Sequence, residues 1–187
     1  MLALLPAEAA VDPRLAWGII LHDVGKAVTR TVDERGVHFY GHVQQGEKIA
    51  DEIMQRLKFS RAQREAVLNL IGQHMNFMNV QKMRPARLKR FLRIPDFDLH
   101  LELHRIDCLA SHGMLDNYEF CRNQLENLTV EELHPPRLIT GDDLIALGIP
   151  PGKIIGDILR ALEDEQMEGR ISSRDEAIMF VEKNREK

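Results

Sequence analysis

The feature that most constrains this chain is a helical spacing of apolar residues along most of its length. Between residues 42 and 57 the apolar or small positions recur at alternating intervals of three and four residues. They are Val43, Gly46, Ala50, Ile53 and Leu57. Such spacing places an apolar stripe along one face of an α-helix, and Gly46 indicates a close approach to a neighbouring segment. The same period returns in most later segments, so we predict an all-α fold.

Capping signals divide this pattern into successive helices. Ser60 followed by Gln63 is a capping-box pair and predicts the start of a helix. The stretch 29–40 differs, because β-branched residues flank the sequence DERG, which predicts a short hairpin or an ordered loop. We predict an HD-type helical bundle over residues 1–128 and a smaller helical tail over residues 129–187, with a soft boundary between them.

The charge balance restricts the kinds of partner. The 187 residues include 25 Lys and Arg against 29 Asp and Glu, a net charge of −4 with neutral His. Binding of nucleic acid through bulk charge needs a basic protein, so any such binding has to use local patches. The two cysteines have no metal-site or redox spacing, and no apolar run approaches the roughly 18 residues of a membrane span. We therefore expect reduced thiols, no membrane partner, no signal peptide and a cytoplasmic location, whereas the oligomeric state is not indicated.

Five residues with metal-ligating side chains lie on or beside apolar faces of separate predicted helices. They are His22, Asp23, His42, His74 and Asp107. Imidazole nitrogen and carboxylate oxygen suit a borderline divalent ion such as Mn, Fe, Co, Ni or Zn. A single histidine on an apolar face, however, is more often a hydrogen-bonded core residue than a ligand. From spacing alone, the metal site and the structural core both stay open.

One later helix offers a second arrangement of the same residue types. His100, His104 and Asp107 are spaced by four and then three residues and so share a face. We favour Asp107 as the single ligand from this helix, with His104 in contact with a ligand or with the substrate. Arg105 is either a phosphate clamp or a partner in a surface ion pair, and the ion pair is the simpler interpretation.

The chain has one strongly basic stretch. Its cations are Lys82, Arg84, Arg87, Lys89, Arg90 and Arg93. This stretch is either a solvated helix face or a surface that meets RNA phosphates, for which we select Arg84, Arg87 and Arg90 as candidates. Lys153 follows a Pro-Pro-Gly turn at a predicted helix start and is a further phosphate-binding candidate, although a plain helix connection is the simpler reading there.

Several segments carry a resemblance to known families. The segments LHDVGK, FYGH, QHM and HRIDCLASHG resemble the HD superfamily of metal-dependent phosphohydrolases. More narrowly, FYGHVQQGEKIADEIMQRLKFS, LIGQHM, HRIDCLASHG and LITGDDLIALGIPPGKIIGDIL together resemble the C-terminal half of bacterial tRNA nucleotidyltransferases and poly(A) polymerases. The resemblance runs from about Leu15 to the end. It implies an all-helical HD core followed by a helical segment that helps to hold tRNA.

The resemblance also implies roles for individual residues. It matches five residues to metal ligands: the doublet His22 and Asp23, the distal Asp107 and the additional histidines His42 and His74. It implies one or two divalent ions, with Mg²⁺ among the candidates, and Asp23 as the bridge between two ions. Lys26 would neutralise a substrate phosphate as a point charge. The implied reaction is hydrolysis of a phosphate mono- or diester of a nucleotide, such as a 2′,3′-cyclic nucleotide end.

The chain departs from the family pattern in two ways. The HD pattern begins with an upstream histidine, and no His precedes His22; we expect a fragment or a misplaced start, and weaker metal binding by a site without that ligand. The nucleotidyltransferase head is also missing from the sequence, so we expect that the chain as it stands does not polymerise nucleotides. The alternative function is therefore a catalytically silent RNA-binding body that serves a head elsewhere.

Overall fold

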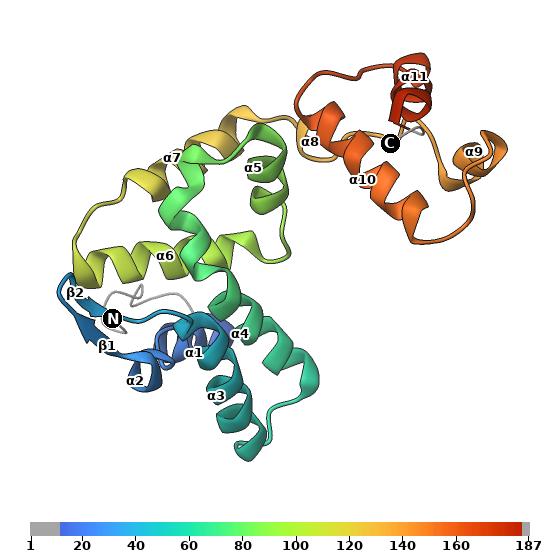
Figure 1. Ribbon diagram of the computed structural model, residues 1–187. Coiled ribbons are helices and arrows are strands. Elements are labelled where there is room, and N and C mark those ends of the chain that lie inside the picture. The colour runs from blue at the N-terminus through green and yellow to red at the C-terminus, as the bar shows by residue number, and fades with distance from the viewer. Residues whose placement is uncertain (1–11, 185–187) are drawn as a thin grey trace. The chain divides into compact units, whose positions relative to one another are not determined.

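The computed structural model describes residues 12–184, most of which lie in α-helices (Figure 1). The predicted all-α class is confirmed. The described residues form two compact units: unit 1 comprises residues 12–81 and 96–122, and unit 2 comprises residues 82–95 and 123–184. Residues 1–11, on which the absence of a signal peptide was predicted, lie outside the described range. No helix between residues 12 and 184 is both long and apolar enough to cross a bilayer.

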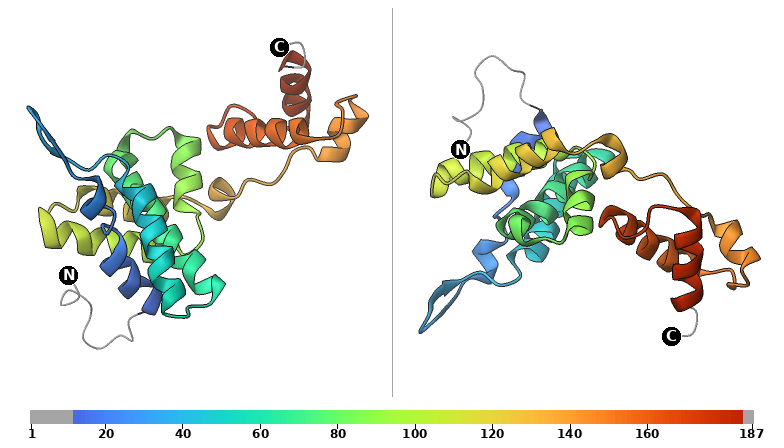
Figure 2. Two further views of the ribbon diagram at one scale, coloured as in Figure 1. Left: turned by 60° about the horizontal axis from the view of Figure 1, so that its bottom comes forward. Right: turned by 90° about the horizontal axis from the view of Figure 1, so that it is seen from above.

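Unit 1 is a helical bundle with one small hairpin. Its elements are α1 (Pro13–Leu21), α2 (Lys26–Thr29), β1 (Thr31–Asp33), β2 (Gly36–His38), α3 (His42–Arg56), α4 (Arg61–Gln73), the 3-10 helix η2 (His74–Lys82), α6 (Phe97–Ser111) and the first part of α7 (Asp116–Asn127). The strands are antiparallel, with Thr31 opposite His38, and project from the bundle (Figure 2). Of the two readings of residues 29–40, the hairpin is therefore the observed one.

The bundle of unit 1 is held by the apolar stripes of α1, α3, α4 and α6. Ile19 of α1, Leu70 of α4 and Leu103 of α6 belong to one buried cluster. Met54 of α3 and Ile71 of α4 belong to a second. The predicted capping box of Ser60 and Gln63 is present at the start of α4. These contacts place the end of α1, the start of α3 and the end of α4 close together.

A backbone contact in unit 1 determines how close the first turn of α3 lies to the loop after α1. A Cβ atom on Gly25 would lie 2.0 Å from the carbonyl oxygen of His42 and 2.6 Å from the backbone nitrogen of Gly46. No real Cβ atom approaches backbone so closely, so only glycine fits at position 25. The close approach predicted at Gly46 is confirmed by this contact.

Unit 2 is a smaller helical assembly. It contains α5 (Pro85–Leu92), the end of α7, α8 (Val130–Leu133), α9 (Gly141–Ala146), α10 (Lys153–Met167) and α11 (Arg174–Asn184). Leu144 of α9, Leu162 of α10 and Val181 of α11 belong to its buried apolar core.

Helix α5 belongs to unit 2, although the sequence places it before the predicted boundary at residue 128. Arg90 and Arg93 form ion pairs of 2.7 and 2.8 Å with Glu163 of α10. Lys89 donates a hydrogen bond of 3.0 Å to the carbonyl oxygen of Met167. Such polar contacts leave no periodic signal in the sequence, because they depend on single residues about 70 positions apart.

Candidate metal centre

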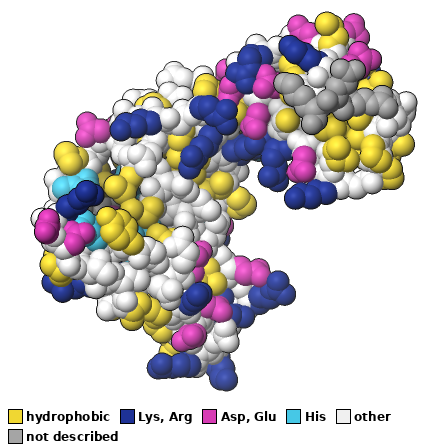
Figure 3. Space-filling view, viewed as in Figure 1, with side chains coloured by type: hydrophobic (Ala, Val, Ile, Leu, Met, Phe, Trp, Pro, Cys, Tyr) yellow, Lys and Arg dark blue, Asp and Glu magenta, His cyan; other side chains and the backbone are white. Residues whose placement is uncertain are grey.

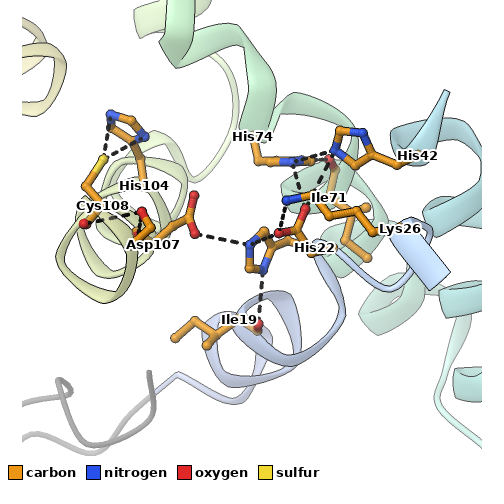
Figure 4. A network of polar contacts seen from close by, with 11 residues as sticks. Ile19, His22, Lys26, His42, Ile71, His74, His104, Asp107 and Cys108 are labelled. Carbon is orange, nitrogen blue, oxygen red and sulfur yellow. Dashed lines mark hydrogen bonds and ion pairs between the residues drawn. The ribbon is translucent and has the colours of Figure 1, made fainter. Parts of the chain in front are cut away.

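Four elements of unit 1 bring the five predicted ligands together (Figure 4). His22 and Asp23 follow α1, His42 begins α3, His74 follows α4 and Asp107 lies on α6. The five residues form two groups, one of His22, Asp23 and Asp107 and one of Asp23, His42 and His74. Within each group the candidate ligand atoms all lie within 4.8 Å of one another. Asp23 belongs to both groups.

The three imidazoles are oriented by the same kind of backbone hydrogen bond. Their Nδ1 atoms contact the carbonyl oxygen three residues earlier: His22 with Ile19 at 3.0 Å, His42 with Phe39 at 2.9 Å and His74 with Ile71 at 2.6 Å. A carbonyl oxygen can only accept, so Nδ1 carries the proton and Nε2 of the neutral ring keeps its lone pair. Histidine ligands of metal ions commonly have this arrangement, in which one ring nitrogen, here Nδ1, donates to a backbone oxygen and the other, here Nε2, binds the ion.

The Nε2 atoms of these histidines face other hydrogen-bond acceptors. Nε2 of His22 is buried, 3.3 Å from Asp23 Oδ2 and 3.4 Å from Asp107 Oδ1. Nε2 of His42 lies 3.4 Å from Nε2 of His74. Acceptors at these distances repel one another unless a positive charge lies between them. The mixed nitrogen and oxygen donors of each group therefore fit a divalent transition ion.

The electrostatics of the centre favour positive charge. Burial of His22 opposes its protonation, but the carboxylates of Asp107 and Asp23 outweigh burial and raise its pKa to about 9. Burial also opposes ionisation of Asp23, yet His22 and Lys26 hold the pKa of that carboxyl well below its usual range. Burial lowers the pKa of His74. A proton on His22 thus supplies positive charge in the absence of an ion, and an ion that binds there displaces it.

The centre is open on its carboxylate side. The side chains of His22 and His74 are 5% and 8% exposed, whereas those of Asp23 and Asp107 are 34% and 39% exposed. Lys26 Nζ donates to Asp23 Oδ2 at 2.6 Å. Histidine side chains show at the surface of unit 1 beside acidic and basic ones (Figure 3). A ligand that reaches the centre therefore meets carboxylates and an ammonium group first.

The other predicted residues of α6 do not join either group. The ring of His104 stacks on Phe77 with centroids 4.4 Å apart, and its Nε2 lies 3.6 Å from Sγ of Cys108. Burial lowers the pKa of His104 to about 4. His100 is buried and, within the described part of the chain, its Nδ1 has no hydrogen-bond partner. Of His100, His104 and Asp107, which share one face of α6, Asp107 is thus the residue that reaches the centre.

Arg105 forms a surface ion pair, which is the simpler of its two readings. Its Nε and Nη2 atoms donate to the two carboxylate oxygens of Glu102 at 2.8 and 2.6 Å. Both residues lie on α6, one turn apart. The guanidinium is therefore engaged within its own helix.

Two residues of the centre were not singled out from the sequence. Gly25 permits the contact that places the His22–Asp23 doublet against His42. The carbonyl oxygen of Phe39 orients His42, and the Phe39 ring lies 5.7 Å below Nζ of Lys26. Both lie within three residues of a ligand, so proximity to the motifs was the available signal.

The candidate RNA-binding cations fall in unit 2 and differ in their surroundings. Arg84, Arg87 and Lys153 are exposed and form no ion pair with any described residue. Arg90 instead pairs with Glu163 and with Asp164, both at 2.7 Å. Arg90 therefore holds α5 to α10.

Comparison with known proteins identifies relatives along most of the chain. The chain is 34% identical over 179 residues to the CC-adding tRNA nucleotidyltransferase of Thermus thermophilus, covering 93% of this chain and 40% of the relative. It is 30% identical over 192 residues to the A-adding tRNA nucleotidyltransferase of Deinococcus radiodurans, covering 96% of this chain and 44% of the relative. The chain thus spans less than half the length of these curated relatives. No solved structure matches it significantly.

A family model gives the clearest assignment. The model described as tRNA nucleotidyltransferase domain 2, putative, matches residues 31–181. The matched range contains His42, His74 and Asp107 and begins after His22 and Asp23. Membership of the HD superfamily stays a prediction. Because the family model covers most of the sequence, the chain belongs to the tRNA nucleotidyltransferase domain 2 family.

Proposed function

We propose that this chain is the tRNA-binding body of a tRNA nucleotidyltransferase. The family match over residues 31–181 carries the proposal, and the CC-adding and A-adding relatives support it. Arg84, Arg87 and Lys153 supply exposed cations for RNA phosphates in a chain that is acidic overall. A cytoplasmic location is part of the proposal. The nucleotide-adding reaction is not assigned to this chain, which spans 40% and 44% of the two relatives.

Fluorescence anisotropy with a labelled tRNA transcript at several salt concentrations tests this proposal. Affinity should fall steeply with salt, and the double substitution Arg84→Gln/Arg87→Gln should reduce the slope of log K against log[salt] by about 1 to 2. The matched control is Arg35→Gln/Arg56→Gln, which removes two exposed arginines of unit 1. A signal insensitive to salt, or an equal loss in the control, would count against tRNA binding by α5.

We further propose that unit 1 is a metal-dependent phosphohydrolase. The observation that favours it is the shared orientation of three imidazoles, whose Nε2 atoms point at each other and at two carboxylates. A divalent ion held by these residues would supply a coordinated water with a near-neutral pKa and a Lewis acid for a phosphoryl oxygen.

The protein groups divide the remaining work of this reaction. His22, Asp23 and Asp107 would hold one ion, and His42 and His74 with Asp23 a second. Lys26 faces the open side and would offset the charge of a substrate phosphate. The exposed carboxylate side leaves room for a phosphate mono- or diester, including a 2′,3′-cyclic nucleotide end.

Elemental analysis and activity assays test the hydrolase proposal together. The purified chain supplied with Mn²⁺ or Ni²⁺ should retain at least one ion per chain. Hydrolysis of a phosphomonoester and of a 2′,3′-cyclic nucleotide should drop at least about 100-fold in His22→Ala and Asp23→Ala. Asp98→Asn, which changes an exposed carboxylate of α6, is the control. Absence of bound metal, or equal rates in wild type and variants, would refute it.

A further inference from the structure

Unit 2 contains a cleft that neither proposed function uses. It has a volume of about 590 Å³ and lies between the end of α5, the segment 135–139 and one face of α10. All its lining residues belong to unit 2. Clefts that hold small ligands have volumes of roughly 300 to 1,000 Å³, so this one is large enough for a nucleotide.

The walls of the cleft are held in place by polar contacts. Arg93 donates to the carbonyl oxygen of Leu133 at 3.1 Å and pairs with Glu163 at 2.8 Å. Gln166 Nε2 donates to the carbonyl oxygen of Pro136 at 2.9 Å, which ties the segment 135–139 to α10. The cleft therefore exists before any ligand binds, which lowers the entropic cost of binding.

The cleft has a surplus of positive charge. Among the described residues, four arginines line it and a single glutamate, Glu163, opposes them. Arg90 and Arg93 form ion pairs with that glutamate. Arg137 and Arg160, in contrast, are exposed and form no ion pair within the described residues. Two guanidinium groups at the rim are thus available to an anion, and guanidinium binds phosphate in a bidentate manner.

Part of the cleft lining is apolar, and we call this part its floor. Ile94, Leu138 and Leu159 are partly buried and line it. Gly156 of α10 lines it as well, and a Cβ atom built at Gly156 meets no atom within 4 Å. Glycine weakens a helix interior relative to alanine, so the missing side chain gives space at a cost in helix stability.

We propose that this cleft binds one nucleotide, with its phosphate on Arg137 and Arg160 and its base over the apolar floor. A phosphate at the rim matches the two unpaired guanidinium groups, and a planar base covers Leu138 and Leu159. The nucleotide is either free or part of an RNA strand. In the second case the inference rests on the proposed tRNA-binding function and identifies one of its contact points.

The test compares tRNA with free mononucleotides on the full chain. Binding of a labelled tRNA transcript is followed by anisotropy, and binding of AMP and CMP by calorimetry. Gly156→Leu fills the cleft from a position with free space, and Gly156→Ala is its control because a methyl group leaves most of the volume. Arg137→Gln/Arg160→Gln removes the two free cations, and Arg35→Gln/Arg56→Gln is the control of equal charge. Thermal denaturation confirms that each variant folds.

The expected losses are specific to the cleft. Arg137→Gln/Arg160→Gln and Gly156→Leu should each weaken binding about tenfold, and both controls less than about twofold. If tRNA binds but AMP and CMP do not, the cleft recognises a nucleotide within an RNA strand. If AMP or CMP binds but tRNA does not, the cleft recognises a free nucleotide. If wild type binds no tRNA, the proposed tRNA-binding function fails. In that case the proposal for the cleft is supported only if AMP or CMP binds to the wild type and Gly156→Leu abolishes this binding. Unchanged binding in Gly156→Leu, or no binding of any of the three probes, overturns the inference.

Discussion

The two units of this protein use their charged side chains in opposite ways. In unit 1, Nε2 of buried His22 faces the carboxylates of Asp23 and Asp107, and this arrangement favours a positive charge, a proton or a metal ion, between them. In unit 2, Arg90 and Glu163 form a matched ion pair that joins two helices. Facing acceptors that need a positive charge between them indicate a ligand site, whereas an ion pair that joins two helices indicates a structural role. The difference shows that the surroundings of a charged residue, and not its type, distinguish a binding role from a structural one.

The two units should also differ in their response to one added methyl group, placed on a glycine of each. Gly25→Ala puts a Cβ atom 2.0 Å from a backbone oxygen of unit 1. We expect the opening free energy of unit 1 to fall by about 4 kcal/mol or more. Gly156→Ala meets no atom within 4 Å in unit 2 and should stabilise α10 by up to about 1 kcal/mol.

Hydrogen exchange followed by mass spectrometry measures this contrast, because peptides from each unit report their own opening. Gly25→Ala should lose protection in α1, α3 and α4, and Gly156→Ala should keep protection throughout. Equal behaviour of the two variants would show that the backbone contact at Gly25 does not hold unit 1 together.

A second prediction separates the two carboxylates of the metal centre. Asp23 belongs to both ligand groups and Asp107 to one. Asp23→Asn should weaken the binding of both Mn²⁺ ions by about 100-fold. Asp107→Asn should weaken the binding of one ion and leave the binding of the other unchanged. Elemental analysis after dialysis measures the ions retained per chain, with Asp98→Asn as control. Equal retention in Asp23→Asn and Asp107→Asn would contradict a bridging role for Asp23.

A third prediction concerns the pH dependence of unit 1. Burial lowers the pKa of His100 from 6.5 to about 4. Between these values the unfolded chain binds a proton that the folded chain excludes, so the stabilising contribution is full above pH 6.5 and is lost as pH falls through 4. The loss is on the order of 2 to 3 kcal/mol.

His100→Leu should make this part of the stability profile about half as steep, because burial lowers the pKa of His104 on the same helix to about 4 as well. The profile is measured by hydrogen exchange of α6 peptides in the presence of a chelator. The control is His134→Gln, which changes an exposed histidine of unit 2. A slope in His100→Leu as steep as that of the wild type would assign the pH dependence to other groups.

The smallest expected effect is at the matched pair of unit 2. Glu163→Gln leaves Arg90 and Arg93 without their shared carboxylate, so the contact between α5 and α10 should weaken by about 1 kcal/mol. The same change removes the negative charge of the cleft, and tRNA affinity should rise about twofold at low salt. Exchange of α5 peptides and anisotropy measure the two effects. Weaker tRNA binding would show that Glu163 orients the arginines for RNA.

Helix positions were predictable from local pattern, and contacts between helices only in part. The spacing of Val43 to Leu57 and the capping box at Ser60 predicted α3 and the start of α4, because both signals lie within a few residues. The place of α5 in unit 2 was not predictable, because it depends on pairs such as Arg90 with Glu163. Of the three candidate residues on one face of α6, the structure brings Asp107 to the metal centre, whereas His104 stacks on Phe77.

Local sequence patterns were enough to predict the helical class, the hairpin or loop at residues 29–40 and the five residues that meet in unit 1. These follow from periodicity, turn composition and the resemblance carried by short motifs, all of which are local. Contacts between helices were needed to learn which nitrogen of each histidine faces inward and that Arg137 and Arg160 border a cleft. The physical reason is that hydrogen bonds and charge balance depend on distances of a few ångströms between segments far apart in the chain.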